Sequence, residues 1–182
     1  MTDATDTITD PNVMIDIETL GTEPGCAIVS IGVVRFDVGG VIPDSGSYWS
    51  VDIESCQSHG LTIDAETLKW WLKQPDVVQE QLRGGYALPG VLAELSNYID
   101  SDDVVWANPP KFDAAILEAA YGVVDQDVPW KYWNLRDSRT LFETFDHHPK
   151  DEFDGQDHVA IDDARQQAEI VAATLRAGDG DD

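Results

Sequence analysis

The chain has 182 residues, of which 42% are hydrophobic, and it contains six Trp, five Tyr and five Phe. This length and composition are typical of one folded domain with a sizeable core. No stretch approaches the ~20 apolar residues that span a membrane, and the acidic first ten residues do not fit a secretory signal. Cys26 and Cys56 lack metal-ligand spacing and are too few for a disulfide framework, so we expect two reduced thiols in a cytoplasmic protein.

The charge balance is strongly acidic, because 35 acidic residues against 11 basic ones give a net charge of −24. Proteins that hold nucleic acid by counterion release normally carry the opposite sign. Either the chain does not bind nucleic acid, or it works in concentrated salt, where the Debye length falls to ~3 Å at 1 M. The acids are spread along the whole chain and Lys is scarce, which favours a protein from a high-salt organism.

In chain order, we expect residues 1–11 to form a disordered acidic leader, residues 12–177 the folded domain, and residues 178–182 an acidic tail. Three segments rich in Val and Ile come first, separated by turns that contain glycine. They predict strands over 13–17, 27–37 and 47–53. Short turns between successive strands imply that these three are antiparallel.

The apolar residues then change to helical spacing. Asp64 is a suitable N-cap for a helix over 64–72. Further on, the pattern predicts helices over 88–99, 110–121 and 157–175, and strands over 104–107 and, with a weaker signal, 132–136. Strands that come first and then alternate with helices predict an α/β fold, a mixed five-stranded sheet flanked by helices.

Two carboxylates interrupt the first predicted strand. Residues two apart in a strand point to the same face, so Asp16 and Glu18 project together from a segment otherwise made of Val, Met and Ile. Side by side at a buried strand end they would repel each other unless a cation neutralised them. The alternative is an edge strand on which both acids are simply solvated.

Two later segments carry similar chemistry. Asp113 follows the strand that ends at Ala107 and falls in the first turn of a helix, a position where active sites of sheet proteins often lie. Its alternative role is an acid that stabilises the helix start. His158 precedes Asp162 and Asp163 near the start of the last helix. His158 could act as a general base, since imidazoles titrate near neutral pH; the alternative is an exposed histidine beside ordinary first-turn acids.

The three segments together give four carboxylates and one histidine. Oxygen ligands suit Mg²⁺ or Mn²⁺, and two such ions ~3.5–4 Å apart can clamp the attacking and leaving oxygens of a phosphodiester. The combination therefore indicates hydrolysis of phosphodiester bonds with two divalent metal ions as cofactors.

The sequence resembles the histidine branch (DEDDh) of the DEDD exonuclease superfamily, which has a ribonuclease H-like fold. Asp-Ile-Glu-Thr-Leu-Gly at 16–21, Phe-Asp at 112–113 and His-x4-Asp-Ala at 158–164 match the three motifs of this family. The similarity is greatest to phage-type and exodeoxyribonuclease VIII-like 3′→5′ exonucleases. That likeness rests on four further segments, at 67–74, 106–110, 129–133 and 136–140.

The resemblance implies a role for each motif residue. Asp16, Glu18, Asp113 and Asp163 would be the metal ligands and His158 the general base. Asp163 fits better than Asp162 because it stands five positions after His158 and is followed by Ala. The tyrosine branch of the superfamily does not fit, because Val159 occupies the position that its tyrosine would take.

The resemblance also suggests contacts with the substrate. Leu20 would wedge against the terminal base, and Thr19 would offer backbone contacts to the 3′ end. Trp70 or Trp71 could stack on a base, but neighbours on a helix face different directions, so at most one lines the cleft. Core packing is the alternative for both, and Trp70 is the one we assign to the substrate. We also expect contacts from Asn108 and Arg139, although Arg139 could instead pair with a nearby acid.

The sequence therefore predicts a metal-dependent 3′→5′ exonuclease that acts on a nucleic acid with a free 3′ end and releases nucleoside 5′-monophosphates. One alternative is a catalytically silent interaction module of the same fold. Another is a proofreading partner of a polymerase. The choice between DNA and RNA and the oligomeric state, including a homo-oligomer, are left open by the sequence.

Overall fold

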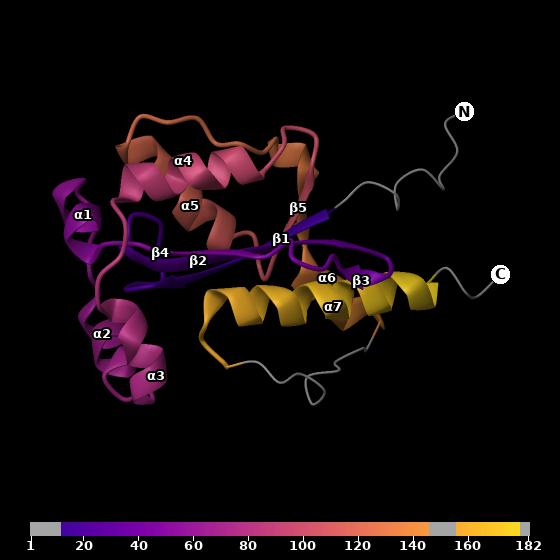
Figure 1. The fold of residues 1–182 in the computed structure, drawn as a ribbon, viewed down its shortest axis with the longest axis horizontal. Helices are drawn as coiled ribbons and strands as arrows, with labels where there is room; N and C mark the ends of the chain where they lie inside the picture. Colours follow the sequence, from indigo (N-terminus) through magenta and orange to yellow (C-terminus); the bar gives the residue numbers. More distant parts are fainter. Residues whose placement is uncertain (1–11, 146–155, 179–182) are drawn as a thin grey trace.

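The structure is a computed structural model that describes residues 12–145 and 156–178. The expected leader over 1–11 and residues 179–182 of the expected tail lie outside the described residues, so both expectations stay predictions. Within the described part, the elements form a mixed sheet with helices on both faces (Figure 1).

The sheet has the strand order β3-β2-β1-β5-β6, with β4 also paired to β2. Its strands are β1 (Asn12–Thr19), β2 (Ile28–Asp37), β3 (Gly40–Val41), β4 (Ser47–Ser50), β5 (Val104–Ala107) and β6 (Leu135–Asp137). The pairs formed by β1 to β4 are antiparallel, as predicted, whereas β5 pairs in parallel with β1 and with β6. The prediction of five strands missed β3, which is only two residues long.

The helices of the described part fall into short and long ones. The short elements are α1 (Ile53–Ser58), α2 (Ala65–Trp71), α3 (Asp76–Gln79), η2 (Glu80–Leu82), η3 (Tyr132–Asn134) and α6 (Ser138–Phe145). The longer helices are α4 (Leu88–Tyr98), α5 (Asp113–Val123) and α7 (Ala160–Gly178). The sequence predicted α2, α4, α5 and α7 but not α1, α3 and α6, which have eight residues or fewer.

Each face of the sheet has its own hydrophobic core. Helices α4 and α5 cover one face, and α6 and α7 cover the other (Figure 1). Strand β1 contributes Val13, Ile15 and Ile17 to the first core and Met14 to the second. Because side chains alternate along a strand, Asp16 and Glu18 lie on the same face as Met14, which is the face that α7 covers.

Two element boundaries differ from the predictions. The strand predicted over 47–53 ends at Ser50, because Asp52 caps α1 by accepting hydrogen bonds from the Glu54 and Ser55 amides. The helix predicted over 157–175 begins at Ala160 instead. His158 has a φ of 65°, in the left-handed region, which a right-handed helix excludes. His158 therefore lies in the loop before α7 and not on the helix.

The start of α7 lies directly on strand β2. Gly32 is the antiparallel partner of Asp16. A Cβ atom on Gly32 would lie 2.3 Å from the Ala160 carbonyl carbon and from the Ile161 amide nitrogen. Only glycine allows this approach, so Gly32 sets the distance between α7 and the acidic end of β1.

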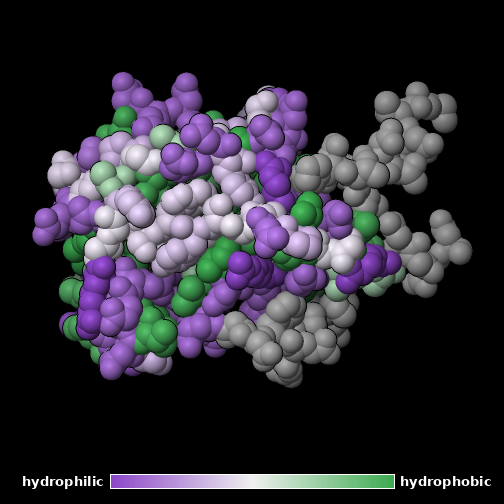
Figure 2. Space-filling model, viewed as in Figure 1, coloured by the Kyte–Doolittle hydropathy of each residue, from purple (hydrophilic) through white to green (hydrophobic). Residues whose placement is uncertain are grey.

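The visible surface is mostly hydrophilic, with hydrophobic side chains gathered over α2 and α3 at the lower left (Figure 2). There Leu72 and Val77 are 62% and 58% exposed. None of the described helices is both long and apolar enough to cross a membrane.

We expect Gly32→Ala to destabilise the protein by about 1–3 kcal/mol, the usual cost of overpacking, because the new methyl group would push α7 off the sheet. Gly90→Ala is the matched control, since a Cβ at this helical glycine meets no atom within 4 Å. It should stabilise the protein by about 0.5–1 kcal/mol. Urea unfolding measures both changes, and an equal effect at the two positions would contradict the close approach.

Candidate active site

A cleft of about 790 Å³ brings together the acidic residues of the three sequence motifs. Its walls come from β1, the start of α5, helix α6, and the first half of α7 with the loop before it. Six carboxylates line it. Four of them belong to the predicted metal ligands Asp16, Glu18, Asp113 and Asp163, and the other two to Glu143 and Asp157. The structure thus gathers all four predicted metal ligands in one place.

The two carboxylates of β1 are strongly affected by their surroundings. Burial raises the pKa of Glu18 to about 8, and the charges of Asp163 and Asp113 add to the effect. Burial also raises the pKa of Asp16 well above its usual range, with further contributions from Asp113, Asp163 and Glu18. The alternative that these acids are solvated at a sheet edge is wrong, because β1 lies between β2 and β5.

Asp113 is the most buried of the four, with 2% of its surface exposed. It is the first residue of α5, and its Oδ2 accepts a hydrogen bond of 3.2 Å from the Asn108 backbone amide. Burial raises the pKa of Asp113 to about 7, although backbone amides and the charge of Arg139 oppose that shift. The turn after β5 therefore holds this carboxylate in place. The backbone amides and Arg139 offset the effect of burial on its charge only in part.

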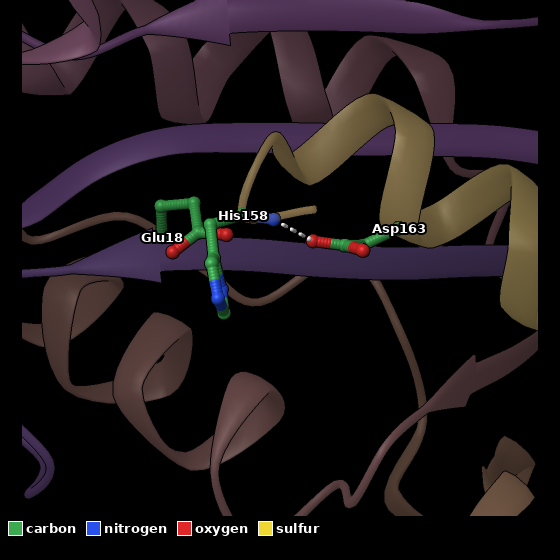
Figure 3. A group of neighbouring side chains, drawn as sticks. All are labelled: Glu18, His158 and Asp163. Carbon is green, nitrogen blue, oxygen red and sulfur yellow. Dashed lines mark hydrogen bonds between the residues drawn. The ribbon is translucent and has the colours of Figure 1, made fainter. Parts of the chain in front are cut away.

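Asp163 and His158 are joined through the backbone. The His158 amide donates a hydrogen bond of 3.0 Å to Asp163 Oδ2, while the imidazole points away from α7 (Figure 3). Burial raises the pKa of Asp163 to about 6, against the opposing effects of that hydrogen bond and of the His158 charge. Ligand atoms of Glu18, His158 and Asp163 all lie within 4.8 Å of one another. The neighbouring Asp162 is not among the residues that line the cleft and lies 3.6 Å from Arg165.

Two side chains hold the His158 loop in place. Gln81 Nε2 donates a hydrogen bond of 2.6 Å to the His158 carbonyl oxygen, and its own Oε1 accepts one from Ser30 on β2. The Trp70 ring packs edge-on against the imidazole with centroids 4.8 Å apart. These contacts fix the imidazole beside Glu18 from two directions.

The predicted substrate contacts divide into two groups. Asn108 and Arg139 line the cleft. Trp70, 37% exposed, lines an adjacent groove of about 500 Å³ together with Thr19. Leu20 instead lies in the hydrophobic core with 1% exposed, so the structure gives its predicted contact with a base no support.

Trp71 and Thr19 form a hydrogen bond with each other. Trp71 is fully buried, and its Nε1 donates a hydrogen bond of 2.9 Å to the Thr19 carbonyl oxygen. The Thr19 hydroxyl donates to the Gly21 carbonyl oxygen at 2.6 Å. As expected, only one of the two adjacent tryptophans reaches the groove, and it is Trp70.

Gln167 is a cleft residue that the sequence reasoning missed. Its Nε2 donates a hydrogen bond of 2.8 Å to Asp16 Oδ1. Its Oε1 and the Oδ1 of Asn108 are buried acceptors without a hydrogen-bond partner among the described residues. The signal was the spacing, because Gln167 stands four residues after Asp163 and therefore on the same face of α7.

Comparison with known proteins adds independent findings. The model of the family described as the 3′-5′ exoribonuclease Rv2179c-like domain matches residues 11–175. An exodeoxyribonuclease of Enterobacteria phage T4 is 24% identical over 160 residues, which cover 71% of this chain and 70% of the relative.

Solved structures share the fold. The nuclease domain of 3′hExo, a DEDDh family member bound to rAMP, matches with a TM-score of 0.66 at 15% identity and 94% coverage of both chains. E. coli Exonuclease I in complex with a dT13 oligonucleotide matches with a TM-score of 0.61 at 13% identity, over 93% of this chain and 40% of that one. The fold is therefore the ribonuclease H-like fold of DEDDh exonucleases.

The raised pKa values predict that the metal-free protein loses stability as the pH rises. An acid with a higher pKa in the folded state stabilises the fold below its unfolded pKa, and that contribution is lost as the pH rises through the folded pKa. For Glu18 this window runs from 4.5 to about 8. In EDTA we expect Glu18→Gln to melt at a higher temperature than the wild type at the upper end of the window, and at nearly the same temperature at the lower end.

The control is Glu94→Gln, at an exposed position of α4. Thermal melts across the window should show no pH-dependent difference between that variant and the wild type. Parallel curves for Glu18→Gln and the wild type would contradict the raised pKa that burial and the neighbouring carboxylates give Glu18.

Proposed function

The chain belongs to the Rv2179c-like family of 3′-5′ exoribonuclease domains, and we propose that it uses a two-metal mechanism with a histidine base to release nucleoside 5′-monophosphates from the 3′ end of a nucleic acid. As a DEDDh 3′-5′ exonuclease it is a hydrolase of phosphodiester bonds. One observation supports the mechanism above all: four carboxylates and an imidazole share one cleft.

The donor set suits hard divalent cations. Mg²⁺ and Mn²⁺ prefer oxygen ligands and keep several waters. The carboxylates of Asp16, Glu18, Asp113 and Asp163 would hold the ions, and the unpartnered acceptors of Asn108 and Gln167 suit donors such as metal-bound water. When bound, two such ions stabilise the charge that develops on the attacking and leaving oxygens.

We assign His158 as the base that takes the proton from the attacking water. Its ligand nitrogen lies within 4.8 Å of carboxylate oxygens of Glu18 and Asp163. The Trp70 ring and the Gln81 hydrogen bond limit its movement. General bases that are held in this way contribute about 10²–10⁴-fold to the rate.

The groove beside the cleft suits the terminal nucleotide. Ile17, Glu18 and Phe112 line both the cleft and the groove, so a bound 3′ nucleotide would lie next to the carboxylates. Trp70 and Phe112 offer aromatic surface for a base or sugar, which is tolerant of sequence. Arg139, on the cleft wall, is the residue that we assign to a phosphate.

The acidic composition suits work in concentrated salt. A net charge of −24 repels a polyanion over long distances in dilute buffer. At 1 M salt the Debye length is ~3 Å, so that repulsion no longer prevents approach. We therefore propose that the enzyme comes from a high-salt organism.

The activity is tested with matched RNA and DNA oligonucleotides, labelled at the 5′ or the 3′ end, across a salt series with Mg²⁺ or Mn²⁺. We expect stepwise shortening from the 3′ end, which EDTA abolishes. Asp163→Asn should remove the activity, because it takes a charge from the metal centre. Asp162→Asn is the matched control next to it, outside the cleft, and should retain activity.

In the same assay His158→Ala should lower kcat by about 10²–10⁴-fold while the affinity for Mn²⁺ changes little. Equal loss of activity in the two Asp variants would contradict the assignment of Asp163. A failure of the wild type to release mononucleotides under any metal and salt condition would contradict the function.

Gln167 is expected to position Asp16 for the metal. Groups that hydrogen-bond to metal ligands typically change metal affinity by about 10–100-fold when they are removed. Gln167→Met keeps the length of the side chain but removes both the donor to Asp16 and the free acceptor. Calorimetric titration with Mn²⁺ should therefore show affinity lower by about that factor.

Gln126→Met is the matched control. Gln126 is also half-buried and donates one hydrogen bond, to the Pro89 carbonyl oxygen, but it does not line the cleft. Its variant should bind Mn²⁺ as the wild type does. Unchanged affinity in Gln167→Met would show that Asp16 needs no such support.

A further inference from the structure

An exposed aromatic surface lies at the start of the edge strand β6, outside the cleft. Lys131, Tyr132, Trp133 and Arg136 form it, and we name these four residues the edge platform. Tyr132 is 79% exposed and Trp133 is 59% exposed. Their rings meet edge to face with centroids 4.8 Å apart. Large exposed aromatic side chains that sit together commonly mark an interaction site.

The edge platform is basic in a very acidic chain. Residues 131–139 contain three of the 11 basic residues, and their single acid is Asp137. Asp137 accepts hydrogen bonds from the Arg139 and Thr140 amides at the start of α6. This stretch therefore has a local charge opposite to that of the chain as a whole.

The cations are held close to the aromatic rings. Lys131 Nζ lies 6.0 Å from the Trp133 ring centroid and 2.5 Å from Asp102 Oδ1. Arg136 donates hydrogen bonds to the Trp133 and Leu135 carbonyl oxygens, at 2.8 and 3.0 Å. Within the described part of the chain Arg136 makes no ion pair, so its charge is available to an anion.

Strand β6 connects the edge platform to a wall of the catalytic cleft. Strand β6 runs parallel to β5, with Ala107 opposite Asp137. The chain passes from β6 directly into α6, where Arg139 lines the cleft. Strand β6 spans about 7 Å from Leu135 to Asp137 at ~3.3 Å per residue, and Tyr132 and Trp133 precede it in η3. A strand whose 3′ end lay in the cleft would thus meet Arg139 first and the aromatic rings next.

We infer that the edge platform binds the single-stranded part of the substrate that lies 5′ to the nucleotide being removed. This inference rests on the proposed function for its direction along the strand. Bases stack on exposed aromatic rings without regard to sequence, and Arg136 would meet a phosphate between them. An exonuclease that shortens one strand repeatedly needs such tolerance, because every base passes over the same surface.

The charge pattern favours nucleic acid over a second copy of this chain. A partner copy would bring the same net charge of −24 to the interface. A polyanionic strand offers a phosphate for Arg136 and flat bases for the rings. A copy-to-copy contact is nevertheless an outcome that the experiment below would reveal.

The test compares substrates of different length. In Trp133→Ala we expect kcat/KM for a long single-stranded oligonucleotide to fall by about five- to a hundredfold, the range of one lost stacking contact. Hydrolysis of a dinucleotide, too short to reach the edge platform, should be unchanged. Trp133→Phe should retain much of the wild-type kcat/KM for the long oligonucleotide, since phenylalanine also stacks. Tyr86→Ala is the matched control, at a tyrosine 72% exposed in the loop before α4, and should act like the wild type on both substrates.

A second measurement separates this inference from the proposed function. Anisotropy of a labelled oligonucleotide, at one fixed salt concentration, reports binding by Asp163→Asn with and without Trp133→Ala. Weaker binding in the double variant supports the edge platform even if the wild type releases no mononucleotide. Equal losses on long and short substrates, or unchanged binding, would overturn the inference. A change from dimer to monomer in sedimentation, without an effect of length, would overturn it in favour of a second copy.

Discussion

The burial of four carboxylates beside one another in one cleft is the constraint on which the rest of the structure depends. Burial raises the pKa of Glu18 to about 8 and that of Asp113 to about 7, so full ionisation at neutral pH is unfavourable without added positive charge. Among the residues that line the cleft, Arg139 is the one permanent cation. The site therefore needs cations from solution. The groups that hold its carboxylates in position must leave their negative charge in place.

Those groups are mainly backbone amides and side-chain amides. The Asn108 amide holds Asp113, the His158 amide holds Asp163, and Gln167 holds Asp16. Each donates a hydrogen bond without a formal charge, so each orients a carboxylate while leaving its charge available for a metal. The left-handed conformation of His158 turns its amide toward Asp163 and its imidazole away from α7. Gly32 allows the start of α7 to approach the sheet as closely as this arrangement requires.

The sequence predicted which residues share the cleft better than it predicted the elements around them. Asp16 and Glu18 could be placed on one face from strand alternation alone, and the spacing of His158 and Asp163 matched a known motif. The loop before α7 could not be predicted, because the start of that helix depends on a single positive φ. Helices α1 and α3 are too short to show clear periodicity, whereas α6 was missed although it is no shorter than α2, which was predicted. Leu20 needed the tertiary structure, since only packing shows that it lies in the core, whereas the spacing of Gln167 from Asp163 was a signal in the sequence for its place in the cleft.

An acidic chain can bind a polyanionic substrate because the repulsion between net charges and the attraction at contact act over different distances. Net charge acts over a Debye length, and salt shortens that length to ~3 Å at 1 M. Metal ligation and base stacking act at contact, where salt screens them far less. Cations such as Lys69 and Arg83 already pair with acids of their own helical turn, so they add little attraction. An enzyme built in this way would hold its substrate through metals in the cleft and aromatic rings beside it, and would rely on salt to bring the two polyanions together.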